Sequence, residues 1–273
     1  MKNNFITTYF QIVSLEEKTK RMKLRTIISA LLFCVFLFQS CNQMGKKILV
    51  IGHRGAMGHE TENTITSINK ALELGVDMIE IDVFKIKSGE IVVFHDTNVE
   101  RLTDGKGKIE DYSWEELQKL TLVGNHKIPL LTDVLDAIDA KVVLNIELKG
   151  ANTVKDVNTI ILKYIEEKNW ELSDFMISSF SWEELAIARK VNKEIPIGVL
   201  TDDAPDDAIP IAEKLNAISI NPNFTKLTRE NILVIRETRF LIYPWTVNEE
   251  QDIIKMKRMN VDAIFTNFPE RIY

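Results

Sequence analysis

The sequence predicts an α/β fold, specifically a (βα)8 TIM barrel with a small insertion after the second strand. Short β-branched or apolar runs alternate with helix-like stretches from residue 46 onward, and there are eight such runs. The chain of 273 residues is 45% hydrophobic, which is enough for a sizeable core. We therefore assign residues 46–273 to the barrel and residues 1–45 to a leader and tether. The eight runs are Ile48 to Ile51, Met78 to Val83, Val142 to Leu148, Phe175 to Ser179, Ile195 to Leu200, Ala217 to Ile220, Phe240 to Trp245, and Asp262 to Phe265.

The stretches between these runs carry the signals that begin and end helices. The stretch from Thr64 to Leu74 is followed by Gly75, and glycine commonly ends a helix because it tolerates a left-handed backbone. Ser181 and Thr228 each precede an acidic, helix-forming segment, so both are expected to cap the start of a helix. Helices are thus expected in most gaps between strands.

The gap after the second run is longer and has a different composition. Lys87-Ser88-Gly89-Glu90 is typical of a hairpin turn, which would return the chain through Ile91 to Phe94 and bring His95 beside the second run. The residues after it, about 97–130, contain the Gly- and Lys-rich passage Thr103 to Lys108 and then Ser113-Trp114-Glu115-Glu116. This pattern indicates a loop and a short helix. We expect the insertion to lie over the barrel mouth near the second strand.

The N-terminal residues have the layout of an export signal. Basic residues from Lys18 to Arg25 lead into the largely apolar run Ile27 to Phe38, which is short of the roughly 20 residues of a membrane span. Cys41 follows almost at once, as in bacterial lipoprotein signals, in which the cysteine is lipidated and anchors the mature protein. The prediction is an exported, membrane-anchored lipoprotein of the periplasm or cell envelope. An incidental free thiol after an ordinary signal peptide is the alternative.

Charge and cysteine usage narrow the function classes. The formal net charge of −6 argues against nucleic acid as a partner, because duplex binding normally requires a basic patch. A small anionic substrate remains compatible, since local cations can dominate a pocket. The other cysteine, Cys34, lies in the predicted leader, so we expect no disulfide in the mature domain. The sequence does not indicate an oligomeric state.

Acidic residues interrupt two of the predicted strands. Glu80 and Asp82 are two positions apart, so their side chains point to one face of the strand. Their neighbours are apolar, which favours a buried strand over a surface strand with solvated acids. Paired buried carboxylates need a cation, and one hard divalent ion, Ca²⁺ or Mg²⁺, fits them, with Glu147 from a neighbouring strand as a third oxygen ligand.

Two histidines and two cations accompany these acids. His53 and His95 each follow an apolar run, and although a lone histidine there is more often structural, two beside an acidic pair suit proton transfer. Arg54 can hold phosphate oxygens in a fork, and Lys149 adds a point charge. Trp245, at the end of the seventh run, either packs on a glycerol or head group or belongs to the core. In-line cleavage of a phosphodiester requires this combination, so we expect a metal-dependent phosphodiesterase.

Eight motifs together support a more specific assignment. They are His53-Arg54-Gly55, Glu62-Asn63-Thr64, Gly75-Val76-Asp77, Glu80-Ile81-Asp82, His95-Asp96, Arg101-Leu102-Thr103-Asp104-Gly105, Glu147-Leu148-Lys149 and Trp245-Thr246-Val247-Asn248. In this order, over about residues 48–270, the chain closely resembles the glycerophosphodiester phosphodiesterase family. Two positions depart from the family pattern: Thr61 stands where a proline is usual, and Lys87-Ser88-Gly89 replaces a Thr-Lys-Asp-Gly turn.

The resemblance implies hydrolysis of glycerophosphodiesters to sn-glycerol 3-phosphate and an alcohol. It implies His53 and His95 as the acid-base pair and Arg54 and Lys149 as phosphate contacts. The implied metal ligands are Glu80, Asp82 and Glu147. It also places Glu62 near the glycerol or the metal.

Two rival functions remain open from the sequence. The first is a phosphodiesterase acting on lysophospholipids or glycerol-phosphate polymers at the membrane. The second is a non-catalytic surface lipoprotein that binds phosphoglycerol groups. The presence of both histidines and all three carboxylates counts against the second, because binding alone does not require two proton-transfer groups.

Overall fold

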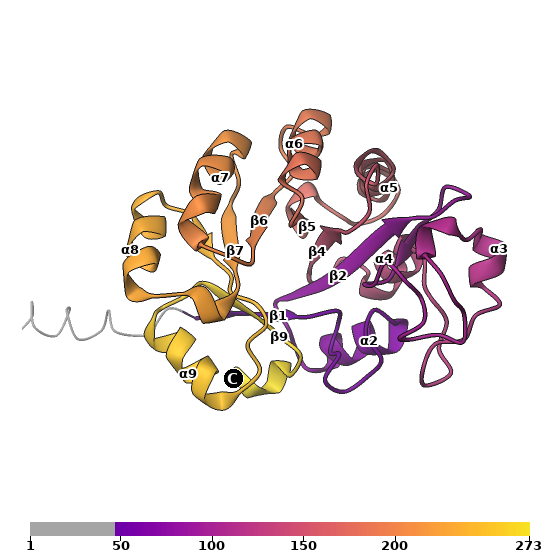
Figure 1. Ribbon diagram of the computed structural model, residues 1–273, viewed down its shortest axis with the longest axis horizontal. Helices are drawn as coiled ribbons and strands as arrows, with labels where there is room; N and C mark the ends of the chain where they lie inside the picture. The colour runs from indigo at the N-terminus through magenta and orange to yellow at the C-terminus, as the bar shows by residue number, and fades with distance from the viewer. Residues whose placement is uncertain (1–46) are drawn as a thin grey trace, which may run out of the picture. The chain divides into compact units, whose positions relative to one another are not determined.

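In the computed structural model, which describes residues 47–273, eight parallel strands form a nearly closed barrel (Figure 1). Their order around the sheet is β8-β7-β6-β5-β4-β2-β1-β9. Backbone hydrogen bonds of 3.0 Å from Asp262 to Ile242 and from Phe265 to Pro244 join the two end strands. The predicted TIM barrel is confirmed. The strands are β1 (Leu49–Gly52), β2 (Met78–Lys85), β4 (Val143–Leu148), β5 (Phe175–Ser179), β6 (Ile197–Thr201), β7 (Ser219–Pro222), β8 (Leu241–Ile242) and β9 (Ala263–Thr266).

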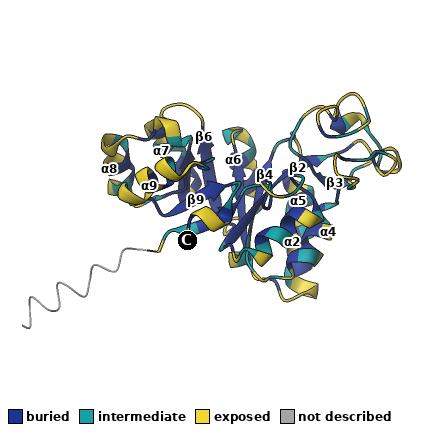
Figure 2. Ribbon diagram, turned by 90° about the horizontal axis from the view of Figure 1, so that it is seen from below, coloured by how far each residue is buried: buried dark blue, intermediate teal, exposed yellow. Residues whose placement is uncertain are grey.

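Helices surround the strands and bury one face each (Figure 2). The Thr64 side chain accepts a hydrogen bond from the backbone N–H of Ser67, and Ser181 and Thr228 cap their helices in the same way, as predicted. Gly75, with φ of 74°, follows the first of these helices. The helices of the ring are α2 (Ile65–Glu73), α4 (Leu131–Ile138), α5 (Val154–Glu167), α6 (Trp182–Val191), α7 (Ile209–Leu215), α8 (Arg229–Glu237) and α9 (Glu250–Arg258).

The insertion after β2 forms a small lobe with its own core. Strand β3 (Ile91–Val93) pairs antiparallel with the end of β2, so the predicted hairpin is present. A short helix, α3 (Trp114–Leu117), is capped by Ser113, whose side chain accepts a hydrogen bond from the N–H of Glu116. The lobe buries a cluster of apolar residues separate from the main core. This cluster contains Phe84, Ile86, Val92, Phe94, Val99, Leu102, Ile109, Leu117, Leu122 and Ile128.

The strand boundaries differ from the prediction at a few points. β6 and β7 each begin two residues later than expected, because Ile195 and Ala217 are buried in the core without joining a strand ladder. β8 contains only Leu241–Ile242, and Pro244, which has no N–H to donate, lies just beyond it.

The predicted leader, including Cys34 and Cys41, lies outside the described residues. Among residues 47–273, no helix has the length and apolar character needed to cross a membrane.

Candidate active site

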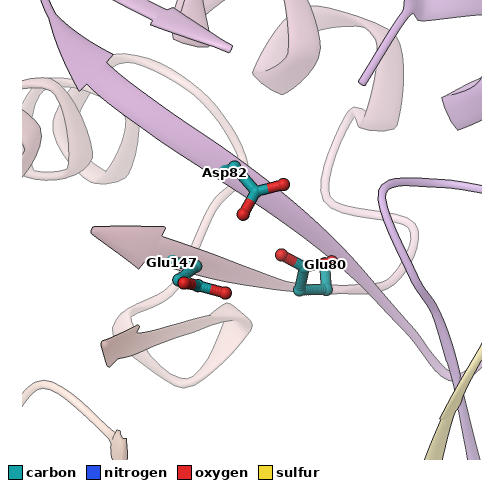
Figure 3. Close-up of side chains that lie close together, drawn as sticks. All are labelled: Glu80, Asp82 and Glu147. Carbon is teal, nitrogen blue, oxygen red and sulfur yellow. The ribbon is translucent and has the colours of Figure 1, made fainter. Parts of the chain in front are cut away.

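Three carboxylates converge where β2 and β4 lie side by side. Glu80 and Asp82 project from β2, and Glu147 projects from β4, where it is the register partner of Asp82 (Figure 3). One oxygen from each of the three lies within 4.8 Å of the others. All three are buried: Glu80 is 2%, Asp82 1% and Glu147 9% exposed. The structure therefore brings together the three predicted metal ligands.

The electrostatics of this cluster favour a bound cation. Burial raises the pKa of Glu80 well above its ordinary value, and the neighbouring carboxylates raise it further. Burial and Glu147 raise the pKa of Asp82 to about 6, and burial also raises the pKa of Glu147 against the opposing effect of Lys149. Glu80 Oε1 is buried without a hydrogen-bond partner. An all-oxygen set with an unpartnered buried oxygen fits a hard divalent ion.

Two cations lie against the carboxylates. Arg54 Nη1 is 2.6 Å from Glu62 Oε1, and its Nε is 3.4 Å from Asp82 Oδ2. Lys149 Nζ donates to Glu147 Oε1 over 2.9 Å. The loop that carries Arg54 packs tightly, because a Cβ on Gly55 would lie 2.6 Å from the backbone carbonyl carbon of Ser67. Both predicted phosphate contacts thus lie beside the predicted metal site.

His53 follows β1, and its ring is held by the opposite end of the chain. Its Nδ1 lies 2.7 Å from the side-chain oxygen of Asn267, and its Nε2 lies 4.0 Å from Glu80 Oε2. Since the amide oxygen only accepts hydrogen bonds, Nδ1 carries the proton and Nε2 is free. Burial lowers the pKa of His53 to about 3, and Arg54 contributes to the decrease. A neutral His53 can accept a proton from a group in the cavity.

His95 follows the hairpin strand and has a different partner. Its Nδ1 lies 2.6 Å from Asp96 Oδ1, and its Nε2 lies 3.4 Å from Lys149 Nζ. Burial would raise the pKa of Asp96, but hydrogen bonds from Arg101 and His95 outweigh burial and bring it to about 2. Asp96 is therefore an anion at neutral pH, and it accepts a hydrogen bond from Nδ1–H, which fixes the orientation of the His95 ring.

Asp96 also begins a chain of ion pairs that reaches the metal site. Arg101 Nη2 donates to Asp96 Oδ1 over 3.1 Å, and Arg101 Nη1 donates to Glu62 Oε2 over 2.8 Å. Glu62 in turn accepts from Arg54. Glu62, which the family resemblance placed near the glycerol or the metal, is thus held between two arginines. Asp96 and Arg101 were part of the family motifs but received no role from the sequence.

A cavity of about 120 Å³ opens between these groups. Of the predicted site residues, Asp82 and Glu62 do not line it. Trp245 lines it together with Phe180, whose ring meets the indole edge-on at 5.2 Å. Phe180 is 42% exposed, so the aromatic pair forms an apolar wall open to solvent. The predicted residues that line the cavity are His53, Arg54, Glu80, His95, Glu147, Lys149 and Trp245.

The remaining histidines lie outside the cavity. His59 Nε2 lies 3.0 Å from Glu270 Oε2, and His126 Nδ1 lies 3.4 Å from the hydroxyl of Thr66. Several residues that the sequence did not assign to the site also contact it, among them Phe180, Asn267, and the fully buried Asn145 and Ser178. Asn145 stands two positions before Glu147, a period-2 signal that could have placed it on the same face.

Comparisons with known proteins agree with this geometry. The glycerophosphoryl diester phosphodiesterase family matches residues 53–271. A glycerophosphodiester phosphodiesterase of Caldanaerobacter subterraneus is 33% identical over 83% of this chain and 96% of its own length. One from Bacillus altitudinis is also 33% identical, over 81% of this chain and 95% of its own. The solved structure of an Oleispira antarctica phosphodiesterase in complex with the product sn-glycerol-3-phosphate superposes with a TM-score of 0.75 at 26% identity, covering 82% of this chain and 94% of that one.

Proposed function

Because the chain belongs to the glycerophosphoryl diester phosphodiesterase family, it is an enzyme that hydrolyses glycerophosphodiesters to sn-glycerol 3-phosphate and an alcohol, and we propose the residues with which it does so. In this proposal Glu80, Asp82 and Glu147 hold one divalent cation, while His53 and His95 transfer protons. The convergence of three buried carboxylates within 4.8 Å supports the proposal most directly. All-oxygen coordination favours Ca²⁺ or Mg²⁺ over metals that prefer nitrogen or sulfur.

Each side chain has a distinct part in the reaction. When bound, the cation would supply positive charge against the phosphate oxygens. Arg54 and Lys149 orient the phosphate and offset the charge that develops on it. Neutral His53 takes the proton of the attacking hydroxyl group at Nε2. His95, whose ring Asp96 orients through Nδ1, gives a proton from Nε2 to the leaving alkoxide.

The aromatic wall has a role in the same proposal. Trp245 donates its indole N–H to the backbone oxygen of Asn221 over 2.8 Å, which fixes the ring at the cavity. The edge-on contact with Phe180 adds to this restraint. We propose that the Trp245 ring packs against the carbon atoms of the glycerol. A rigid apolar surface there orients the substrate without hydrogen-bonding to its hydroxyl groups.

Product analysis tests the proposed function. Purified protein is expected to release sn-glycerol 3-phosphate from glycerophosphocholine and glycerophosphoethanolamine. Chelation of the metal with EDTA should abolish this activity, and added Ca²⁺ or Mg²⁺ should restore it. Lysophosphatidylcholine and glycerol-phosphate polymers serve as the comparison substrates. Turnover of these compounds alone would replace the proposal with the membrane-lipid or polymer activity. Substrate binding without turnover at any added metal would leave only a phosphoglycerol-binding protein.

We further propose that the protein is exported and anchored through a lipid on Cys41. The basic stretch, the apolar run and the cysteine shortly after it support this location. Wild-type protein expressed in a bacterium that processes lipoproteins is expected in the membrane fraction, and the Cys41→Ser variant in the soluble fraction. Cys34→Ser is the matched control and should fractionate as wild type. Equal distribution of Cys41→Ser and wild type would contradict the anchor.

A further inference from the structure

Asn145 stands among the proposed metal ligands with its whole amide unpartnered. It lies on β4, is 0% exposed, and neither its Oδ1 nor its Nδ2 has a hydrogen-bond partner. Ser178 Oγ, on the adjacent strand β5, is also buried and unpartnered. Native proteins seldom leave even one buried polar atom unpaired, because its lost hydration is not replaced. The unpartnered amide oxygen, buried beside carboxylates, therefore calls for a cationic ligand.

The register places this amide beside the carboxylates. Glu80 on β2 is the register partner of Asn145, and Asp82 is the register partner of Glu147. These four residues form a square on two neighbouring strands, and the period of two directs all four side chains to the barrel interior. Asn145 also lines the cavity with Glu80 and Glu147, whereas Asp82 does not. The amide therefore occupies the fourth corner of the proposed metal site.

The chemistry of the square suits an amide at this corner. Three carboxylates already outweigh the charge of one divalent ion by one, and a fourth carboxylate would increase the repulsion that burial imposes here. An asparagine oxygen adds a hard ligand without adding charge, and Ca²⁺ accepts carbonyl and amide oxygens together with carboxylates. Asn145 is 0% exposed, so its amide oxygen is closed to a water-sized molecule. A smaller cation can still approach it.

We propose that Asn145 is a fourth, neutral oxygen ligand of the cation, in addition to Glu80, Asp82 and Glu147. The proposal rests on the proposed function, because it assumes that the three carboxylates bind a divalent ion. It assigns to Asn145 a role in metal affinity, which can be measured without turnover.

Calorimetric titration of metal-free protein with Ca²⁺ and Mg²⁺ tests the proposal. Asn145→Leu keeps the approximate volume but removes the oxygen, and it is expected to raise the Kd for the cation by about tenfold or more. Asn145→Asp keeps an oxygen at this position and is expected to bind the cation at least as tightly as wild type. Asn221→Leu is the matched control. Asn221 is equally buried with an unpartnered Nδ2, but its Oδ1 accepts from Ser219 and it does not line the cavity.

Thermal melting separates a ligand from a structural amide. In EDTA, Asn145→Leu is expected to melt no lower than wild type, because an unpartnered amide contributes nothing to the metal-free fold. With saturating Ca²⁺ it should show a smaller increase in Tm than wild type. An unchanged Kd, or an equal loss of Tm with and without cation, would overturn the role of Asn145 and leave the proposed function intact. If the Asn145→Leu variant does not fold, a higher Kd for Asn145→Asp than for wild type overturns the role of Asn145. Absence of cation binding by wild type would instead overturn the metal site.

Discussion

The Glu80→Gln variant is expected to lose about 3 kcal/mol or more of transition-state stabilisation, measured from kcat/KM, and to gain stability in the metal-free state. Activity falls because glutamine removes one anionic ligand and weakens the proposed metal site. Stability rises because Glu80 is 2% exposed beside two other carboxylates. A neutral isostere removes the repulsion that the ionised side chain imposes when no cation is bound.

The gain in stability depends on pH in a defined direction. Burial, with the neighbouring acids, raises the pKa of Glu80 in the folded state, so the folded protein holds a proton that the unfolded chain releases above pH of about 4.3. Stability of the metal-free protein therefore decreases as pH rises above this value. Asp82 adds the same trend between its ordinary pKa of 3.8 and its folded value of about 6. The advantage of Glu80→Gln over wild type should be small at pH 4 and larger at pH 7.5.

Thermal melts in EDTA across this pH range measure the effect, and saturating Ca²⁺ should reverse it by stabilising wild type more than the variant. Glu166→Gln, at an exposed position of α5, is the control for loss of one negative charge. A variant that melts below wild type at pH 7.5 in EDTA would show that the attraction between Arg54 and the ionised Glu80 outweighs the repulsion from the neighbouring carboxylates. The sign of the difference therefore decides which of the two effects is larger.

The barrel could be predicted because its strands are buried on both faces. Such strands appear in the sequence as nearly continuous apolar runs, as in Met78–Lys85, where only the last residue is partly exposed. The strand ends were less accurate, since Ile195 and Ala217 are apolar and buried without belonging to a ladder. Apolar character reports burial, whereas the ladder depends on backbone partners that the sequence does not show.

Site residues could be predicted only where residues close together in the sequence determine their position. The period of two places Glu80 and Asp82 on one face, and a strand end places His53 and Lys149 at the barrel mouth. The pairing of His53 with Asn267 spans 214 residues and depends on closure of the barrel. Likewise, the spacing places Asn145 on the face of Glu147, but its position beside Glu80 depends on the register of the two strands. These contacts follow from tertiary structure, so no spacing in the sequence could reveal them.

His53→Ala and His95→Ala are each expected to lower kcat/KM for glycerophosphocholine by about 10²- to 10⁴-fold, the usual contribution of a proton-transfer group. The two variants should differ when the leaving group changes. A p-nitrophenyl ester of glycerol phosphate releases a stable phenolate that needs no proton. His95→Ala should therefore recover most of its loss on this ester, whereas His53→Ala should lose a similar factor on both substrates because the attacking hydroxyl is unchanged.

This difference follows from the partners of the two rings. The anionic Asp96 lies 2.6 Å from His95 Nδ1 and orients that ring, while Asn267 offers His53 only a neutral amide oxygen. Asp96→Asn should accordingly reproduce part of the His95→Ala defect on glycerophosphocholine and little of it on the nitrophenyl ester. Recovery by His53→Ala in place of His95→Ala would reverse the two roles. Equal losses by both variants on both substrates would mean that protonation of the leaving alkoxide does not limit the rate, and that the two imidazoles act by binding the phosphate.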